Sequence, residues 1–371
     1  MFWTLTSKGI QVPPTRFEGS PLGLVSNSMS SFAIDQSDGM LWAWGKNEMG
    51  ALGDDTETFR STPVSVVGNH SFVSVSCGYG NAVAAKANRS AWCWGDNRYG
   101  QCGDGSRSNR SSPVSVLGEH SFVYIITGSY HPLALKADGS AWSWGYNGIG
   151  RLGDGTTADR SSPVSVIGGH IFIMLTACSG STLGLKADGS VWTWGDNSQG
   201  ELGVGDRNAR SSPVSVLGGH SFRMITSGGR NFSALKLDGS VWAWGQNNYG
   251  QLGDGTQQGR SSPVSVFGGH SFLRVFGGFY HTLAVKVDGT LWAWGSNNKG
   301  QFGNGSITNK NSPVVAAYSM SFPYIAPGHQ HVLAMTAERV CYAWGRNEEG
   351  QLGDKTRNER SSPVSVYRAF N

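Results

Sequence analysis

The chain has 371 residues, a formal net charge of +4 and only 15% charged residues, whereas glycine occupies 54 positions and tryptophan 14. Abundant glycine indicates many turns, and 38% hydrophobic residues can form a large core, which excludes a low-complexity disordered chain. Lysine and arginine are scattered and no apolar run is long enough for a membrane span, so neither a basic tail nor membrane insertion is expected.

The cysteines are odd in number and dispersed, without the C-x-x-C spacing of a zinc site or a redox motif. We expect reduced thiols, no metal and no cofactor. Reduced thiols and the lack of a recognisable signal peptide together favour an intracellular protein, cytoplasmic or nuclear. The five cysteines are Cys77, Cys93, Cys102, Cys178 and Cys341.

A repeat of fifty residues runs through the chain. The tetrapeptide Trp42-Ala43-Trp44-Gly45 recurs at this interval, ending with Tyr342-Ala343-Trp344-Gly345, and the seven copies keep one register without an insertion. An asparagine, a glycine and a proline recur with it, at positions 47, 50 and 63 of the first copy. Repeats of this length form units that stack and share a core.

One unit, residues 170–219, shows the expected elements in chain order. Residues 172–176, 182–186 and 190–194 are rich in apolar and β-branched residues or alternate with a period of two, and each predicts a strand. Residues 213–216 predict a fourth strand that begins at a proline. Four strands per unit is the pattern of a β-propeller.

The second and third strands are joined by Asp188-Gly189, and Asp-Gly recurs at this place in most units. Both residue types tolerate a positive φ, so the pair predicts a hairpin with a two-residue turn. Within the third strand, the two tryptophans lie on one face of the sheet. They are expected to pack between blades and to be mostly buried, Trp242 included.

The last unit ends in an ordinary fourth strand, residues 361–366, without the polar cap that an open stack needs. The predicted fold is therefore all-β, a closed seven-bladed β-propeller of four antiparallel strands per blade. Residues 20–371 are assigned to the propeller and residues 1–19 to an N-terminal arm.

Two segments could close the ring. Residues 361–366 repeat the other fourth strands, whereas residues 11–16 keep only the proline, Pro13, and add Pro14, which lacks a backbone donor. We therefore expect residues 361–366 to complete the blade that contains Trp42 and Trp44, with the N-terminal segment peripheral to the ring.

The recurring pattern G-x-x-H-x-L-A-L-K-x-D-G-x-x-W-x-W-G-x-N-x-x-G-Q-L-G, followed by P-x-x-V, resembles the repeat of the regulator of chromosome condensation family over residues 20–366. The resemblance implies a seven-bladed propeller. It implies no single function, since this repeat occurs in an exchange factor for the small GTPase Ran, a plant ultraviolet photoreceptor, ubiquitin-ligase subunits and bacterial protein inhibitors.

The loop between the first and second strands differs from unit to unit, and such loops usually carry binding specificity. Its aromatic and polar residues are typical of interface hot spots, so we predict a partner-binding patch here. The candidate residues are Tyr79, Tyr130, His131, Arg230, Asn231, Phe279, Tyr280, His281, His329, Gln330 and His331.

A basic residue recurs at the end of the glycine-rich loop in all seven units: Arg60, Arg110, Arg160, Arg210, Arg260, Lys310 and Arg360. We expect each to pair with the aspartate six residues earlier, except where Val204 and Asn304 replace it. The alternative is an anion-binding or nucleic-acid-binding rim, opposite to the loop patch.

A histidine also recurs at one position of five units: His70, His120, His170, His220 and His270. Equivalent positions of adjacent blades are about 10 Å or more apart, too far for two ligands of one metal ion. A turn-stabilising role is expected for these five residues.

No catalytic triad, carboxylate pair or phosphate loop is recognisable, so we expect no enzymatic activity. The preferred function is a scaffold or adaptor that binds a protein partner, alone or as a subunit of a larger assembly. The alternatives are nucleotide exchange on a small GTPase, although no segment projects from the equal-length units, and association with chromatin or nucleic acid.

Overall fold

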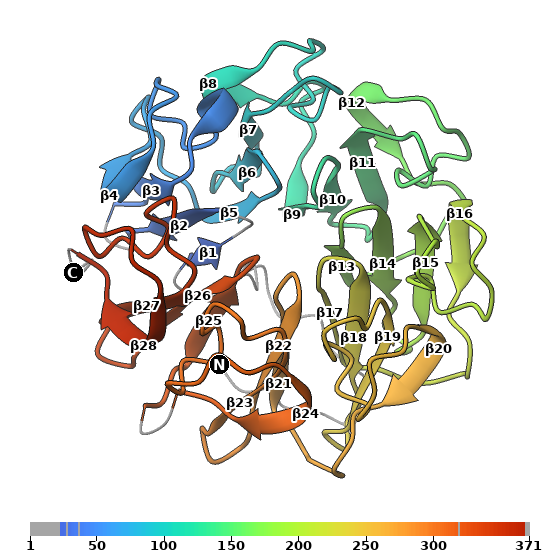
Figure 1. The fold of residues 1–371 in the computed structure, drawn as a ribbon. Coiled ribbons are helices and arrows are strands. Elements are labelled where there is room, and N and C mark those ends of the chain that lie inside the picture. Colours follow the sequence, from blue (N-terminus) through green and yellow to red (C-terminus); the bar gives the residue numbers. More distant parts are fainter. Residues whose placement is uncertain (1–22, 27–28, 36–37, 318–319, 368–371) are drawn as a thin grey trace.

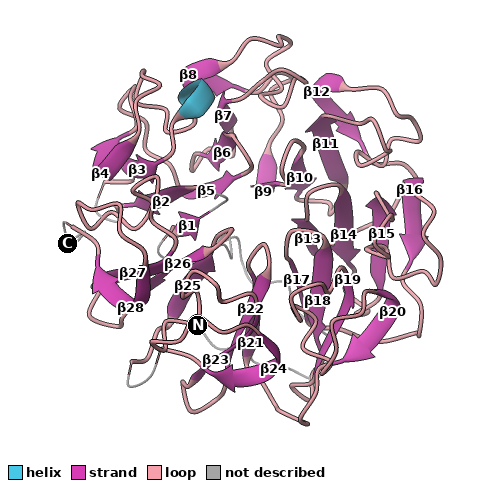
Figure 2. Ribbon diagram, viewed as in Figure 1, coloured by secondary structure: helices cyan, strands magenta, loops and turns pink. Residues whose placement is uncertain are grey.

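The computed structural model describes residues 23–26, 29–35, 38–317 and 320–367. These residues form seven antiparallel sheets of four strands, arranged as a ring (Figure 1). In the described part of the chain, the one helical element is the 3-10 turn η1 (Glu48–Gly50) (Figure 2). None of this part forms a helix with the length and apolarity to cross a bilayer. The predicted seven-bladed all-β propeller is confirmed.

Each blade is a continuous stretch of chain, with its first strand at the central channel and its fourth at the outer rim (Figure 1). The strands are β1 (Val25–Ser26), β2 (Ser30–Ile34), β3 (Leu41–Gly45), β4 (Arg60–Ser65); β5 (Ser74–Cys77), β6 (Asn81–Ala85), β7 (Ala91–Gly95), β8 (Arg110–Ser115); β9 (Phe122–Thr127), β10 (Pro132–Lys136), β11 (Ala141–Gly145), β12 (Arg160–Ser165); β13 (Met174–Ala177), β14 (Ser181–Leu185), β15 (Val191–Gly195), β16 (Arg210–Ser215); β17 (Met224–Ser227), β18 (Asn231–Leu235), β19 (Val241–Gly245), β20 (Arg260–Ser265); β21 (Arg274–Gly277), β22 (His281–Val285), β23 (Leu291–Gly295), β24 (Lys310–Val315); β25 (Tyr324–Pro327), β26 (His331–Met335), β27 (Cys341–Gly345), β28 (Arg360–Ser365).

The fourth strand begins earlier than the sequence suggested. In the fourth blade β16 starts at Arg210, and Pro213 lies inside the strand rather than at its start. The pairing with β15 shifts register between Thr193 and Gly195, so the proline sits at an irregularity of an outer strand, where a missing backbone donor is tolerated.

The hairpin between the second and third strands also differs from the prediction. Gly189 has a φ of +82°, but Asp188 is not among the residues with positive φ. The Lys186 amide donates to the Ser190 carbonyl (2.9 Å), and the Asp188 carboxylate accepts the Ser190 amide (2.8 Å). The loop is thus longer than two residues, and the aspartate stabilises it through its side chain.

The segment between the third and fourth strands enters the groove next to the following blade. We call residues 46–59 and their six repeats the inserted loops. In the third blade, Leu152 is fully buried, and its amide donates to the Asn147 side chain (3.0 Å). A Cβ on Gly150 would lie 2.5 Å from the Cα of Ser211 in the next blade, so only glycine permits this approach.

The second tryptophan of each third strand packs against the inserted loop of the preceding blade. The Trp144 indole is fully buried, and its Nε1 donates to the Gln101 carbonyl (2.9 Å). The same indole-to-carbonyl bond occurs at six of the seven blade junctions, from Trp44, Trp94, Trp144, Trp244, Trp294 and Trp344.

The first tryptophan is only half-buried, contrary to the expectation that both are core residues. The Lys236 Nζ lies 4.3 Å from the Trp242 ring centroid, and the His220 ring lies 4.1 Å from it. His220 also packs on Gly218 in the turn after the fourth strand. This stack of lysine, tryptophan and histidine recurs in five blades, which is consistent with the structural role predicted for these histidines.

Ring closure was predicted wrongly. Strand β28 pairs with β27 of its own blade, whereas the blade of Trp42 and Trp44 takes all four strands from β1 to β4. The ring is closed instead by contacts between the first and seventh blades. Trp44 Nε1 donates to the Gln351 carbonyl (3.0 Å), the Lys355 amide donates to the Ser61 carbonyl (3.3 Å), and Leu352 and Val366 share a core cluster with Trp44. The predicted arm, residues 1–19, and the competing segment 11–16 lie outside the described residues.

These burial differences predict unequal costs for the two tryptophans of one strand. Replacing Trp244 with alanine should lower the free energy of unfolding by about 3–5 kcal/mol, because it leaves a cavity between two blades. Replacing Trp242 should cost less, since solvent already reaches that ring. Chemical denaturation of both variants measures the difference, and equal losses would show that the outer ring also belongs to the core.

Candidate functional site

The predicted loop patch and the basic rim lie on the same face of the propeller, not on opposite rims. In the second blade, Asn81 at the start of β6 pairs with Gly95 at the end of β7, and Gly95 pairs with Arg110 at the start of β8. The loop before β6 and the inserted loop therefore emerge at one end of the blade. We call this end of the seven blades the loop face.

The structure separates the predicted patch into an accessible part and a buried part. His131, His281 and His331 are fully buried, and Asn231 is 1% exposed, so these four residues lie beneath the loop face. Tyr79 is 47% exposed. The remaining patch residues are half-buried at the surface: Tyr130, Arg230, Phe279, Tyr280, His329 and Gln330.

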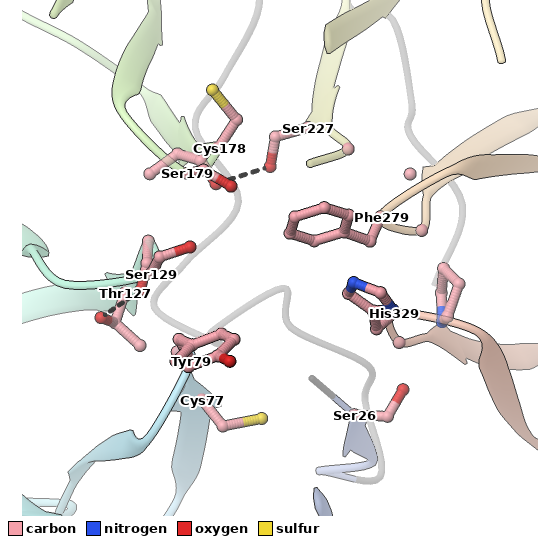
Figure 3. A pocket seen from close by; sticks show the side chains of 18 residues that line it. Ser26, Cys77, Tyr79, Thr127, Ser129, Cys178, Ser179, Ser227, Phe279 and His329 are labelled. Atoms are coloured by element: carbon pink, nitrogen blue, oxygen red, sulfur yellow. Dashed lines mark hydrogen bonds between the residues drawn. The ribbon is translucent and has the colours of Figure 1, made fainter. Parts of the chain in front are cut away.

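A cavity of about 170 Å³ lies at the loop face where the inner strands end; we call it the central funnel (Figure 3). Tyr79 lies on one side of it, and Phe279 and His329 lie on the other. Serine hydroxyls, including those of Ser129 and Ser179, and the backbone of the loops between the first and second strands also line the cavity.

The lining of the central funnel is uncharged. Its side chains are hydroxyls, thiols, small apolar groups, two aromatic rings and His329. Burial, together with the charge of Arg346, lowers the pKa of His329 to about 4, so its imidazole is neutral near pH 7. The funnel therefore suits a neutral group better than an ion.

Two aromatic clusters flank the central funnel, and each includes residues that the sequence analysis missed. Tyr79 contacts Tyr130 (ring centroids 5.7 Å apart), and Tyr99 contacts both Tyr130 (5.9 Å) and Tyr146 (4.6 Å). Tyr99 and Tyr146 belong to inserted loops. The repeat position of Tyr99 and the repeat position of Tyr146 both vary between units, and this variation could have identified the two residues.

On the other side of the central funnel, Phe279 stacks against His329 with ring centroids 4.2 Å apart. Tyr280 contacts both of these rings and also Tyr249, an inserted-loop residue that was not predicted. The second cluster therefore combines three predicted residues with one from the preceding blade. The first cluster contributes Tyr79 to the lining of the cavity, and the second contributes Phe279 and His329.

The three buried histidines lie between blades, and two of them contact a hydroxyl group of the neighbouring blade. His131 Nε2 lies 3.2 Å from the Thr182 hydroxyl of the next blade, and His331 Nε2 lies 3.1 Å from the Ser31 hydroxyl across the ring seam. His281 has no equivalent contact, because the next blade carries Val332 where the blade next to His131 carries Thr182. Neither ring nitrogen of His281 has a hydrogen-bond partner among the described residues. Burial lowers the pKa of His281 and of His331 to about 3, so both are neutral.

Six cations of the basic rim pair with a nearby aspartate, and five of these pairs are the predicted ones. Arg110 lies 2.6 Å from Asp104, and although burial raises the carboxyl pKa, hydrogen bonds from Ser106 and Arg110 hold the pKa of Asp104 below its usual value. Arg210 finds Asp206 (2.6 Å) where Val204 replaces the usual aspartate. The predicted pairs are Arg60–Asp54, Arg110–Asp104, Arg160–Asp154, Arg260–Asp254 and Arg360–Asp354.

Further polar contacts join the patch to the inserted loops. Arg230 Nη1 lies 3.6 Å from the Asp196 carboxylate, and Gln330 donates to the Asn298 side chain (3.3 Å). In the part of the chain that the structure describes, no three histidine, cysteine or acidic side chains come together in a way that could hold a metal ion. The loop face therefore presents aromatic, hydroxyl and amide groups together with ion-paired side chains.

Comparison with known proteins places these features in a family. The model of the RCC1-like domain matches residues 165–370, more than half of the chain, and the model of the regulator of chromosome condensation (RCC1) repeat matches residues 38–85, 90–135 and 138–183. A search of curated protein sequences gave no significant match.

Solved structures share the fold at low sequence identity. Human WBSCR16 is 20% identical, with a TM-score of 0.79 over 89% of this chain and 94% of the other. Yeast RCC1 (Prp20), solved bound to Kap60, is 18% identical, with a TM-score of 0.79 over 98% and 90% of the two chains. A structure of Prp20p from Saccharomyces cerevisiae is 19% identical, with a TM-score of 0.77 over 94% and 88%. From the family-model matches and the seven repeats, this chain belongs to the regulator of chromosome condensation (RCC1) repeat family.

Proposed function

We propose that the protein is a non-enzymatic scaffold or adaptor that binds a protein partner on its loop face. The observation that supports this most is the concentration of blade-specific aromatic residues around an uncharged funnel on that face. The framework residues are the same in nearly every blade, whereas Tyr79, Tyr99, Phe279 and Tyr280 interrupt the repeat. Large, partly exposed aromatic side chains are the residues on which protein interfaces depend most.

The central funnel limits the chemistry of the partner. A cavity of about 150 Å³ in another protein holds one benzene molecule, and the central funnel at about 170 Å³ has a similar size. Its uncharged lining would make insertion of an acidic or basic group costly. We therefore expect the partner to place one neutral aromatic or apolar side chain, carried on a loop tip, between Tyr79 and Phe279.

Alanine at both Phe279 and Tyr280 should weaken partner binding at least about tenfold, or about 1.4 kcal/mol, because it removes the rings beside the cavity. The partner would first be identified by proximity labelling in the native cell, and its affinity for the purified chain then measured by titration. Melting temperatures should show that the variant is still folded.

The matched control for this variant carries alanine at Leu237 and Val287, which are 70% and 82% exposed. Both lie in loops between the second and third strands, at the end of the blades opposite to the loop face. Their replacement removes exposed apolar surface without touching the aromatic clusters. Full affinity of the Phe279/Tyr280 variant, or an equal loss in the control, would move the site away from the loop face.

Nucleotide exchange on a small GTPase is the second candidate, favoured by family membership. Prp20p was described together with its binding to Gsp1p and histones, which are properties of that protein. For this chain, release of labelled GDP from a panel of small GTPases is the direct test. Accelerated release from one member would establish exchange, whereas unchanged release from all of them would reject it.

Association with chromatin or nucleic acid is the third candidate, and the paired rim weighs against it. Six of the seven rim cations have an aspartate as partner, five of them the predicted one and Arg210 the neighbouring Asp206, so little positive charge is left for phosphates. Binding to nucleic acid would weaken steeply with salt. A flat dependence of complex formation on salt would exclude this candidate.

A further inference from the structure

The second blade contains a pair of cysteines in direct contact. Cys93 lies in β7, and Cys102 lies in the inserted loop that follows it. Their sulfur atoms are 2.8 Å apart, and both side chains are fully buried. No covalent bond joins them in this structure, where all five cysteines are free.

The repeat itself shows that this pair is unusual. At the position of Cys93 the other blades carry alanine, serine or threonine, and at the position of Cys102 they carry leucine or phenylalanine. The two cysteines occur together in the same blade, the second, and their sulfurs are therefore in contact. The corresponding residues of the other blades are Ala43 and Leu52, Ser143 and Leu152, Thr193 and Leu202, Ala243 and Leu252, Ala293 and Phe302, and Ala343 and Leu352.

We propose that Cys93 and Cys102 form an intrachain disulfide that fastens the inserted loop of the second blade to β7. The sulfurs need to approach by less than about 1 Å to reach the length of a disulfide, about 2.05 Å. The other three cysteines belong to different strands or loops, and the contact recorded between two sulfurs is the one between Cys93 and Cys102.

The oxidant for this step is a low-molecular-weight disulfide such as oxidised glutathione. One cysteine thiolate attacks a glutathione sulfur, giving a mixed disulfide and releasing one reduced glutathione. The second cysteine thiolate then displaces the other glutathione and closes the Cys93–Cys102 bond. The two protein thiols lose two protons and two electrons in total, and the oxidant becomes two molecules of reduced glutathione.

Burial determines when this reaction can occur. Neither thiol is accessible in the packed loop, and burial raises the pKa of the Cys102 thiol well above its ordinary value, so little thiolate forms there. Exchange therefore proceeds during folding, or when the inserted loop leaves its groove. Once formed, the bond would hold the loop that carries Tyr99 against Tyr130 on the loop face.

The test is to refold the denatured chain in oxidised and in reduced glutathione, denature it again without reductant and alkylate its thiols. We expect three alkylated cysteines after oxidised refolding and five after reduced refolding, with a cross-linked peptide that contains Cys93 and Cys102. The oxidised protein should also melt at a higher temperature. Five alkylated thiols under both conditions, or a bond to any other cysteine, would overturn the proposal.

The matched control is the double variant Cys93→Ala, Cys102→Leu, which reproduces the Ala43 and Leu52 pair of the first blade. It should fold, show three alkylated thiols under both conditions and melt at one temperature in both. A dependence of its melting temperature on glutathione as large as that of the natural chain would show that the redox effect arises elsewhere.

Discussion

A chain that lacks residues 361–371 should lose its folded monomer and aggregate. The deletion removes all but the first residue of β28, the outer strand of the seventh blade, and leaves the edge of β27 unpaired. It also removes Val366, which packs with Trp44 and Leu352 where the ring closes. One deletion therefore damages both a blade and a blade junction. Size-exclusion chromatography and thermal melting measure the outcome.

The control is a chain that ends at Tyr367. It keeps every described strand and Val366, so it should elute and melt like the full chain. If the longer deletion melted at the same temperature as this control, the outer strand of the seventh blade and the Val366 contact with Trp44 would both be dispensable for closing the ring.

Acidification from pH 7 to pH 5 should destabilise the fold through His131, His281 and His331, which are buried between blades. The half-buried His329 beside the central funnel, with its pKa of about 4, acts in the same direction. Burial lowers the pKa of His281 and of His331 to about 3 and lowers that of His131 well below its ordinary value. In the unfolded chain a histidine has a pKa of about 6.5. Below that pH the unfolded state binds protons that the folded state does not, so stability falls as the pH falls towards the folded pKa.

For His281 and His331 the expected loss at pH 5 is about 2 kcal/mol each. The buried His131 adds a further loss of the same sign. Urea unfolding at several pH values measures it. The natural sequence supplies the control, because Asn81 and Asn231 occupy in two other blades the repeat position that His131, His281 and His331 occupy in theirs. Each asparagine is 1% exposed. A variant with asparagine at residues 131, 281 and 331 should lose much less stability between pH 7 and pH 5, and an unchanged pH dependence would contradict this origin.

The fold was largely predictable because the repeat supplies seven aligned copies of one pattern. Strand order, blade number and the tryptophan positions follow from that alignment. Ring closure was not predictable in this way, since residues 361–366 have the same hydrogen-bonding groups whether they pair with β27 or β3. Which pairing forms depends on the local connection, and the sequence of the strand does not encode it.

The site was predicted less completely. Variation between blades identified Tyr79, Phe279 and Tyr280 at the loop face. The same argument wrongly placed His131 and its equivalents at the surface, because the first residue of the second strand lies between blades and is covered by neighbours. Tyr99 was missed because it stands in a glycine-rich loop that otherwise repeats, although the loop brings it within ring contact of Tyr130.

The contacts that close the ring are the same as those at other blade junctions. At the seam Gly350 packs on Ser61, as Gly100 packs on Ser161 within the chain, and the Trp44 bond to Gln351 matches the Trp144 bond to Gln101. The junction where the chain begins and ends is therefore built like the others, and no sheet spans it. Because each sheet is built from one continuous stretch of chain, a circularly permuted chain opened between any other two blades would interrupt one linker and preserve all seven sheets.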